Sequence, residues 1–177
     1  MPYGKPGEEV EELPADNCRT GWFTYADEAT ILTPLVHTGG VDTIVTNDAL
    51  NIQTRDFFAP IGVTNVWDAS SDMFDFTELS TGDVLDIRLD ILVTTTSPNQ
   101  ETNVDLRLGL GGSSYDIHFD QAFFKAAGQH PVNRYNGVYI GDDNTRLNGG
   151  YFVFSSDDNA TIRVNGWYCK VIIRGNI

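Results

Sequence analysis

The feature that most restricts the fold of this chain is a strict alternation of apolar and polar residues in its second half. Apolar residues occupy every second position in residues 84–95, and the same pattern returns in residues 104–110, 115–120 and 167–174. A repeat of two places one face of each strand on a core and the other in water, which is typical of antiparallel sheets. The chain is therefore predicted to be all-β, which excludes the parallel α/β scaffolds and most dinucleotide-binding enzymes.

Further strands and turns divide the rest of the chain. Strands are predicted over residues 21–25, 43–45, 52–57, 62–66, 84–95, 104–110, 115–120, 132–140, 151–155 and 161–164. One short helix is predicted at residues 121–127, and residues 141–146 are predicted to be a polar turn. Asn165-Gly166 is either the turn of a type I′ hairpin or a bulge within one long final strand. About eight to ten strands at these spacings predict an antiparallel two-sheet jelly-roll sandwich over residues 21–177.

The charge balance restricts the partners of this protein. Its 177 residues include 11 Lys and Arg against 25 Asp and Glu, a formal net charge of −14. Nucleic-acid grooves depend on clustered Lys and Arg, and anionic membranes attract polybasic segments, so neither partner is expected. No run of about 18 apolar residues is present, so no membrane helix is expected. The opening MPYGKPG has no apolar core and is not expected to be a signal peptide.

The two cysteines, Cys18 and Cys169, lie near opposite ends of the chain. A disulfide between them would close a very long loop and would suit a secreted protein. Cys169, however, lies on the apolar side of its predicted strand. A buried free thiol is therefore predicted at Cys169.

Residues 1–20 are predicted to be an N-terminal arm outside the domain. This segment contains three prolines and two glycines around a Glu-rich centre, and it cannot bury enough apolar surface to fold alone. It is either a disordered terminus or a docking arm that orders on a partner, with Tyr3, Val10 and Leu13 as anchors. Ordering it would cost roughly 1–2 kcal/mol of backbone entropy per residue, so only a large interface could hold it.

Catalytic and metal-binding motifs are not found in the sequence. Ser113 and Ser114 lie in GGSSY, which is not the G-x-S-x-G elbow of the hydrolases. His37, His118 and His130 are isolated, without zinc spacing or a paired His-x-His. No catalytic, metal or cofactor residues are assigned, and His118 is expected to face solvent from its strand.

Acidic residues gather in turns, where three roles are open. The simplest is that an Asp side chain caps the local backbone. A pair of opposed carboxylates would instead hydrolyse glycosides, and carboxylate oxygens are also the ligands that calcium prefers, although no loop has the EF-hand pattern. Trp67 precedes a polar loop and is expected to be exposed. Trp67, Asp68, Asp142 and Asp143 are therefore the candidate ligand-binding residues.

Three stretches carry a resemblance to a known class of protein: GWFTY at residues 21–25, LSTGDVLDIR at residues 79–88 and VNGWY at residues 164–168. They resemble small trimeric jelly-roll proteins of tailed-bacteriophage particles, which include capsid decoration (cement) proteins and tail-fibre head domains with a TNF- or C1q-like sandwich. The resemblance covers residues 21–174 as a general pattern.

This resemblance implies that the protein has a non-enzymatic structural role on the capsid surface of a virion. It also implies that the protein is made in the host cytoplasm. It also implies that the arm would bind the major capsid protein or another virion protein. No cofactor is implied. The alternative is a receptor- or carbohydrate-binding head domain of a tail fibre.

Bulky residues on both faces of the last strands predict an oligomer. In residues 151–154 and 167–171, large side chains occupy both strand faces. A monomer would expose one of these faces, and soluble monomers rarely expose apolar patches larger than a few hundred Å². Closed symmetry allows one patch to serve every copy. A homotrimer is therefore predicted, with Tyr168 and either Phe152 or Phe154 at the interface near the threefold axis.

Overall fold

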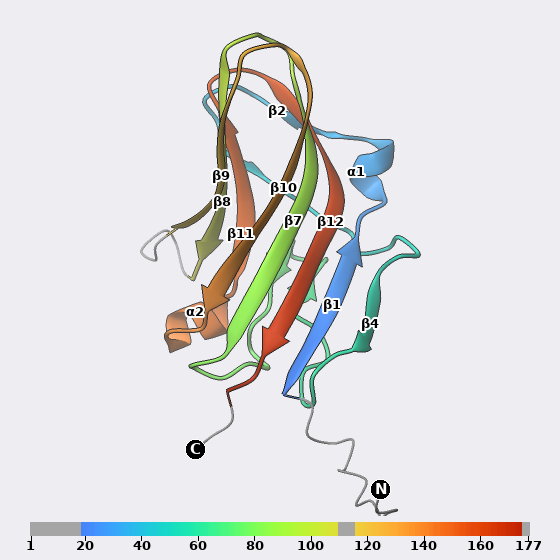
Figure 1. The fold of residues 1–177 in the computed structure, drawn as a ribbon, viewed down its shortest axis with the longest axis vertical. Coiled ribbons are helices and arrows are strands. Elements are labelled where there is room, and N and C mark those ends of the chain that lie inside the picture. Colours follow the sequence, from blue (N-terminus) through green and yellow to red (C-terminus); the bar gives the residue numbers. More distant parts are fainter. Residues whose placement is uncertain (1–18, 110–115, 175–177) are drawn as a thin grey trace, which may run out of the picture.

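The computed structural model of the chain describes residues 19–109 and 116–174. These residues form two antiparallel six-stranded sheets, here called sheet A and sheet B, that pack face to face as a sandwich (Figure 1). The prediction of an all-β two-sheet sandwich is confirmed. The predicted arm residues Tyr3, Val10 and Leu13 lie outside the described residues, as do Cys18, Ser113 and Ser114.

Sheet A has the strand order β10-β7-β12-β1-β4, with β2 also paired to β12. Its strands are β1 (Thr20–Ala26), β2 (Leu35–His37), β4 (Arg55–Phe58), β7 (Val84–Thr95), β10 (Gly128–Tyr139) and β12 (Ala160–Ile172). The strand predicted at residues 84–95 is therefore found with those bounds as β7. It lies between β10 and β12, which are the other two long strands of this sheet.

Sheet B has the order β5-β6-β11-β8-β9, with β3 also paired to β11. Its strands are β3 (Thr43–Ile44), β5 (Trp67–Asp68), β6 (Met73–Phe74), β8 (Gln100–Leu108), β9 (Asp116–Phe124) and β11 (Gly150–Ser156). From β7 onward the chain passes repeatedly between the two sheets, as in a jelly roll. Neither described helix, α1 (Ala29–Leu32) or α2 (Asp143–Asn148), has the length that a membrane-spanning helix needs.

The core lies between the sheets and follows the alternation in the sequence. Along β7, every second side chain from Leu85 to Val93 is fully buried. Trp67 of sheet B meets Trp167 of sheet A edge to face, with ring centroids 4.6 Å apart. Phe152 of β11 lies 5.4 Å from the same Trp167 ring. Because each large aromatic side chain buries roughly 150–250 Å², these rings make up much of the contact between the sheets.

Trp67 is only 1% exposed, so the prediction that it is exposed is wrong. Its indole fills the core, and its Nε1 donates a hydrogen bond to the Asn47 carbonyl at 2.9 Å. The polar residues that follow Trp67 belong to the turn between β5 and β6. The polarity of that turn therefore says nothing about the strand residue before it.

Three further predicted elements are wrong. The helix predicted at residues 121–127 is not formed, because β9 continues to Phe124, which pairs with Gln100 of β8. The polar turn predicted at residues 141–146 contains the start of α2 instead. Residues 62–66, predicted to be a strand, form no strand in the structure.

The alternative left open at Asn165-Gly166 is resolved in favour of the bulge. β12 runs from Ala160 to Ile172 without a turn, and its register against β7 shifts between Val164 and Gly166. A Cβ atom at Gly166 would lie 2.1 Å from the Tyr25 carbonyl oxygen of β1. The bulge is therefore a place where β1 and β12 approach too closely for any side chain.

Candidate functional site: the outer face of sheet A

Five aromatic side chains lie on the solvent-facing side of sheet A. Trp22, Phe58, Tyr135 and Tyr139 are between 39% and 60% exposed, and Tyr168 lies among them half-buried. We call this surface, with these five aromatic residues and the charged residues between them, the aromatic face. Trp22 and Phe58 are in direct contact, with ring centroids 5.2 Å apart.

Strand register explains how residues far apart in the sequence meet on the aromatic face. Arg88 of β7 pairs with Tyr135 of β10 on one side and with Tyr168 of β12 on the other. Tyr168 in turn pairs with Thr24 of β1. Opposed residues of an antiparallel pair have Cβ atoms about 4.5–5.5 Å apart, so these side chains form a continuous row.

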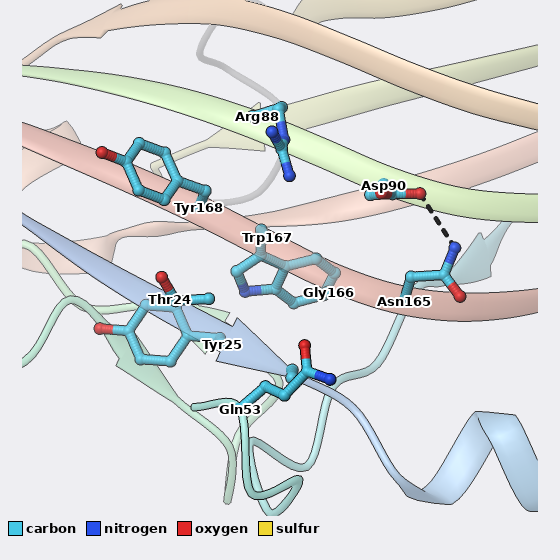
Figure 2. Close-up of a pocket in the computed structure, with 10 residues that line it drawn as sticks. Thr24, Tyr25, Gln53, Arg88, Asp90, Asn165, Gly166, Trp167 and Tyr168 are labelled. Carbon is cyan, nitrogen blue, oxygen red and sulfur yellow. Dashed lines mark hydrogen bonds between the residues drawn. The ribbon is translucent and has the colours of Figure 1, made fainter. Parts of the chain in front are cut away.

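A pocket of about 310 Å³ opens in the aromatic face at the bulge in β12 (Figure 2). Its polar lining comes from three strands and one loop: Thr24 of β1, Gln53 before β4, Arg88 and Asp90 of β7, and Asn165 and Tyr168 of β12. The Asn165 side-chain amide donates a hydrogen bond to Asp90 Oδ1 at 2.9 Å. The bulge thus turns Asn165 toward the neighbouring strand and leaves a recess beside Arg88.

Arg88 is an exposed guanidinium without an ion pair or a side-chain hydrogen bond within the described part of the chain. The two carboxylates nearest to it along β7 have neutral partners instead. Asp90 accepts hydrogen bonds from Asn165 and, at 3.4 Å, from Asn133. Asp86 lies near the phenol of Tyr135, whose pKa is raised to about 12 by partial burial and by that carboxylate.

The structure places Phe152 and Phe154 in the core, where each is 0% exposed. The prediction that one of them lies at a subunit interface is therefore wrong, because both point inward between the sheets. Phe152 packs edge-on against Phe119 at 4.9 Å, and Phe154 packs in the same way against His37 at 4.8 Å. Of the predicted interface residues, Tyr168 alone lies on an outer face.

The predicted ligand-binding residues do not form one site. Asp68 and α2 both border a hollow of about 220 Å³, but Asp142 and Asp143 do not line it. Asp142 caps α2 by accepting a hydrogen bond from Thr145 N at 2.7 Å, and Asp143 forms an ion pair with Arg146 at 3.0 Å.

The loop carboxylates have the capping role that their turn positions indicate. Asp68 accepts hydrogen bonds from the hydroxyls of Ser70 and Ser71, which lower its pKa below the usual range. The hydrogen bond from Thr145 lowers the pKa of Asp142 in the same way. A general acid for glycoside hydrolysis needs a raised pKa, so neither carboxylate suits that role.

The three histidines serve separate local contacts. His37 is buried, with Nδ1 2.9 Å from Thr43 Oγ1. His118 faces solvent as predicted, with its side chain 79% exposed and 2.6 Å from Asp105. His130 stacks on Phe124 with ring centroids 3.8 Å apart. Within residues 19–109 and 116–174, no cluster of three or more His, Cys, Asp or Glu side chains is arranged to hold a metal ion.

A polar crevice of about 560 Å³ lies beyond the edge of the aromatic face. Its lining includes Arg55 and Asp56 of β4, Thr64 and Asn65 from the following loop, and Asp68 of β5. Asn65 is fixed by the Tyr25 hydroxyl, which donates a hydrogen bond to its Oδ1 at 2.6 Å. Of the predicted ligand residues, Asp68 and the buried Trp67 contribute to this crevice.

Most of the aromatic face was not identified from the sequence. The alternation over residues 84–95 places Arg88 on the polar side of its strand, but nothing in the sequence places it beside Tyr135 and Tyr168. The available signal was the spacing of Tyr135 and Tyr139, which puts both on one side of a strand. The pairing of β10 with β7 supplies the missing information.

No protein-family model matches the chain, and no curated protein sequence matches it. Among solved structures, a chain of the T13 IBDV viral particle matches with a TM-score of 0.46 and 12% identity, over 99% of this chain and 36% of that chain. This chain therefore spans little more than a third of the IBDV chain.

Two other solved structures match over most of both chains. Eiger TNF from S. frugiperda matches with a TM-score of 0.45 and 6% identity, over 89% of this chain and 94% of that chain. The PRD1 vertex protein P5 matches with a TM-score of 0.43 and 12% identity, over 88% and 96%. All three TM-scores lie below 0.5, so these similarities assign no function to the chain.

Proposed function

We propose that this chain is a non-enzymatic structural protein of a bacteriophage particle, a decoration protein that forms a homotrimer and binds and stabilises the capsid. The observation that carries the proposal is the aromatic face. Its exposed rings together leave on the order of 400–500 Å² of surface in water, which is the size of the largest patch on a typical soluble monomer, and such patches often mark interaction sites. Tyr and Trp with an Arg among them are also the residues that dominate the centres of protein interfaces.

A second copy of the chain is the proposed partner for the aromatic face. The face combines exposed rings with both signs of charge, from Arg88 and Lys170 to Asp86 and Asp90. A cyclic assembly can place such a face against a different surface of the next copy and close after three subunits. The sequence resemblance to trimeric phage virion proteins supports the number three and the virion setting.

The arm, residues 1–20, is proposed to attach the trimer to the particle. The chain enters β1 at Thr20, directly opposite Ile172 near the end of β12, and Ile173 N donates to the Arg19 carbonyl at 2.7 Å. The arm would therefore extend from this end of the sandwich. Its anchors would be Tyr3, Val10 and Leu13, and its target the major capsid protein or another virion protein.

Deletion of residues 1–18, which leaves Arg19 and Thr20 in place beside β12, tests whether the arm binds the particle while the sandwich forms the trimer. The shortened protein should remain a folded trimer and should no longer co-sediment with purified particles, whereas the full chain should be located on their surface by labelling. Binding to particles with unchanged affinity after the deletion would remove the docking role of the arm. Absence of the full chain from purified particles would reject the virion role itself.

A second candidate function is glycan binding by a tail-fibre head domain, and the polar crevice is the observation that favours it. Carboxylate, amide and hydroxyl groups of Asp56, Asn65 and Thr64 line this crevice, and such groups fix the orientation of polar ligands. Titration with host surface polysaccharide should then change the intrinsic fluorescence, and Asp56→Asn should abolish the change. Trp67→Ala is unsuitable for this test because Trp67 belongs to the core.

A further inference from the structure

We infer that the pocket beside Arg88 binds a carboxylate side chain from a second copy of this chain. The inference rests on the proposed homotrimer and names the group that would fill the pocket. It starts from the position of Arg88, which stands between Tyr135 and Tyr168 in the central row of the aromatic face. Covering this face with another subunit would place the guanidinium inside the interface.

A guanidinium in that position needs an acceptor. Removing an ion from water carries a large free-energy cost, which is recovered only when an opposite charge with good hydrogen-bond geometry faces the ion. Arg88 has no such partner among the described residues of its own subunit, since it forms no ion pair there and the nearby Asp90 accepts from Asn165 and Asn133 instead. The acceptor must therefore come from outside the subunit.

The other side chains of the pocket fit the same ligand. Thr24, Gln53 and Tyr168 each present a hydroxyl or amide that can donate a hydrogen bond, and none of the three makes a side-chain hydrogen bond within the described ranges. A carboxylate has two oxygens with about four acceptor sites, so it can accept a bidentate pair from Arg88 and further bonds from these neighbours. The pocket volume of about 310 Å³ admits an acidic side chain.

The charge of the chain makes a second copy a suitable source of that carboxylate. With 25 acidic residues against 11 basic ones, the remaining surface of any neighbouring copy is rich in Asp and Glu. Contact between two bodies that each carry −14 is opposed by repulsion, unless unpaired cations are concentrated at the contact. Arg88 and Lys170 meet that requirement on the aromatic face, since neither has an ion pair within residues 19–109 and 116–174.

Sedimentation equilibrium of the full chain and its variants tests the inference. Arg88→Met keeps an unbranched apolar stem and removes the charged guanidinium, so it should weaken trimer association more than tenfold by leaving the neighbour's carboxylate unpaired. Arg88→Lys should weaken it less, because an ammonium keeps the charge and loses the bidentate geometry. Arg146→Met is the matched control, since Arg146 already pairs with Asp143 of its own subunit, and it should leave association unchanged.

The outcomes separate this inference from the proposed trimer. A wild-type chain that sediments as a monomer rejects both. A wild-type trimer that Arg88→Met leaves unchanged or makes tighter rejects the carboxylate site alone, because an unpaired buried guanidinium would be improved by an apolar replacement. Circular dichroism and thermal melting of each variant keep a folding defect apart from an association defect. If Arg88→Met is poorly folded, a folded Arg88→Lys that associates more weakly than wild type supports the inference, because this variant keeps the charge and loses only the bidentate geometry.

Discussion

At the scale of single residues, Gly166 shows how a local contact fixes the identity of a side chain. Its φ of +140° lies in a region that other residues rarely adopt, and an added Cβ would lie 2.1 Å from the Tyr25 carbonyl oxygen. Gly166→Ala should therefore lower the free energy of unfolding by about 3 kcal/mol, measured by urea denaturation. Gly62→Ala is the control, because Gly62 has a φ of +79° but open space around it, and it should cost about 1 kcal/mol. Equal effects of the two changes would contradict the close contact.

A buried thiol and a buried phenol predict how the stability of the fold depends on pH in the alkaline range. Burial raises the pKa of the Cys169 thiol and of the Tyr25 phenol above their ordinary values of 9.0 and 10.0. The folded chain therefore keeps protons that the unfolded chain releases, so stability is complete below about pH 9 and falls as the pH rises. Each group should contribute a slope of about 1.4 kcal/mol per pH unit.

Urea denaturation between about pH 8 and pH 11 measures this dependence. Cys169→Val replaces the thiol by an apolar side chain of similar size and should remove the part of the decline that begins near pH 9. A decline of the same steepness in Cys169→Val would show that the thiol is not the group responsible.

At the scale of elements, the helix α2 tests the role assigned to the acidic loops. Asp142 is the N-cap of α2, with its carboxylate on Thr145 N at 2.7 Å. Asp142→Ala should lower the melting temperature by roughly 2–4 °C, because the cap hydrogen bond is lost. Asp143→Ala, which breaks only a surface ion pair, should have a smaller effect. If Asp142 were instead a ligand-binding carboxylate held close to other negative charges, its removal would relieve that repulsion and raise the melting temperature.

The sequence predicts best those strands that have a paired strand on each side and a regular row of side chains in the core. β7 was predicted with its observed bounds, because Leu85 to Val93 alternate without interruption and every inward side chain is buried. The segment before it, Ser80-Thr81-Gly82-Asp83, has the composition of a turn and forms one. Gly82 has a φ of +105° there, and Asp83 accepts a hydrogen bond from Ser80 N at 2.8 Å.

Elements that depend on long-range pairing were predicted less well. Residues 121–124 continue β9 because β8 pairs with them, and no local pattern distinguishes that extension from a short helix. The candidate site shows the same limit. The sequence predicts Tyr168 at an interface, but Arg88 beside it and Tyr135 beyond Arg88 lie 80 and 33 positions away in the sequence and follow only from the register.

At the scale of the whole molecule, side chains that pack against the inner side of sheet A should respond to mutation differently from side chains on its outer side. Phe152 packs from β11 against the inner side of this sheet and is 0% exposed, so Phe152→Ala should lower the free energy of unfolding by about 3–5 kcal/mol. Tyr168 lies on the outer side and is half-buried, so Tyr168→Ala should cost the isolated subunit about 1 kcal/mol or less. Urea denaturation at protein concentrations below the dissociation constant of the trimer measures both losses. Similar losses for the two variants would mean that Tyr168 supports the core rather than an assembly.

Sedimentation equilibrium at micromolar concentration tests the central claim, that the aromatic face joins three copies of the chain, most directly. The wild-type protein should sediment with three times the mass of one chain. Tyr168→Asp should sediment as a folded monomer, because it places a carboxylate in the middle of the proposed interface. A wild-type dimer would keep an interface and remove the threefold assembly, and a stable wild-type monomer at these concentrations would contradict the account.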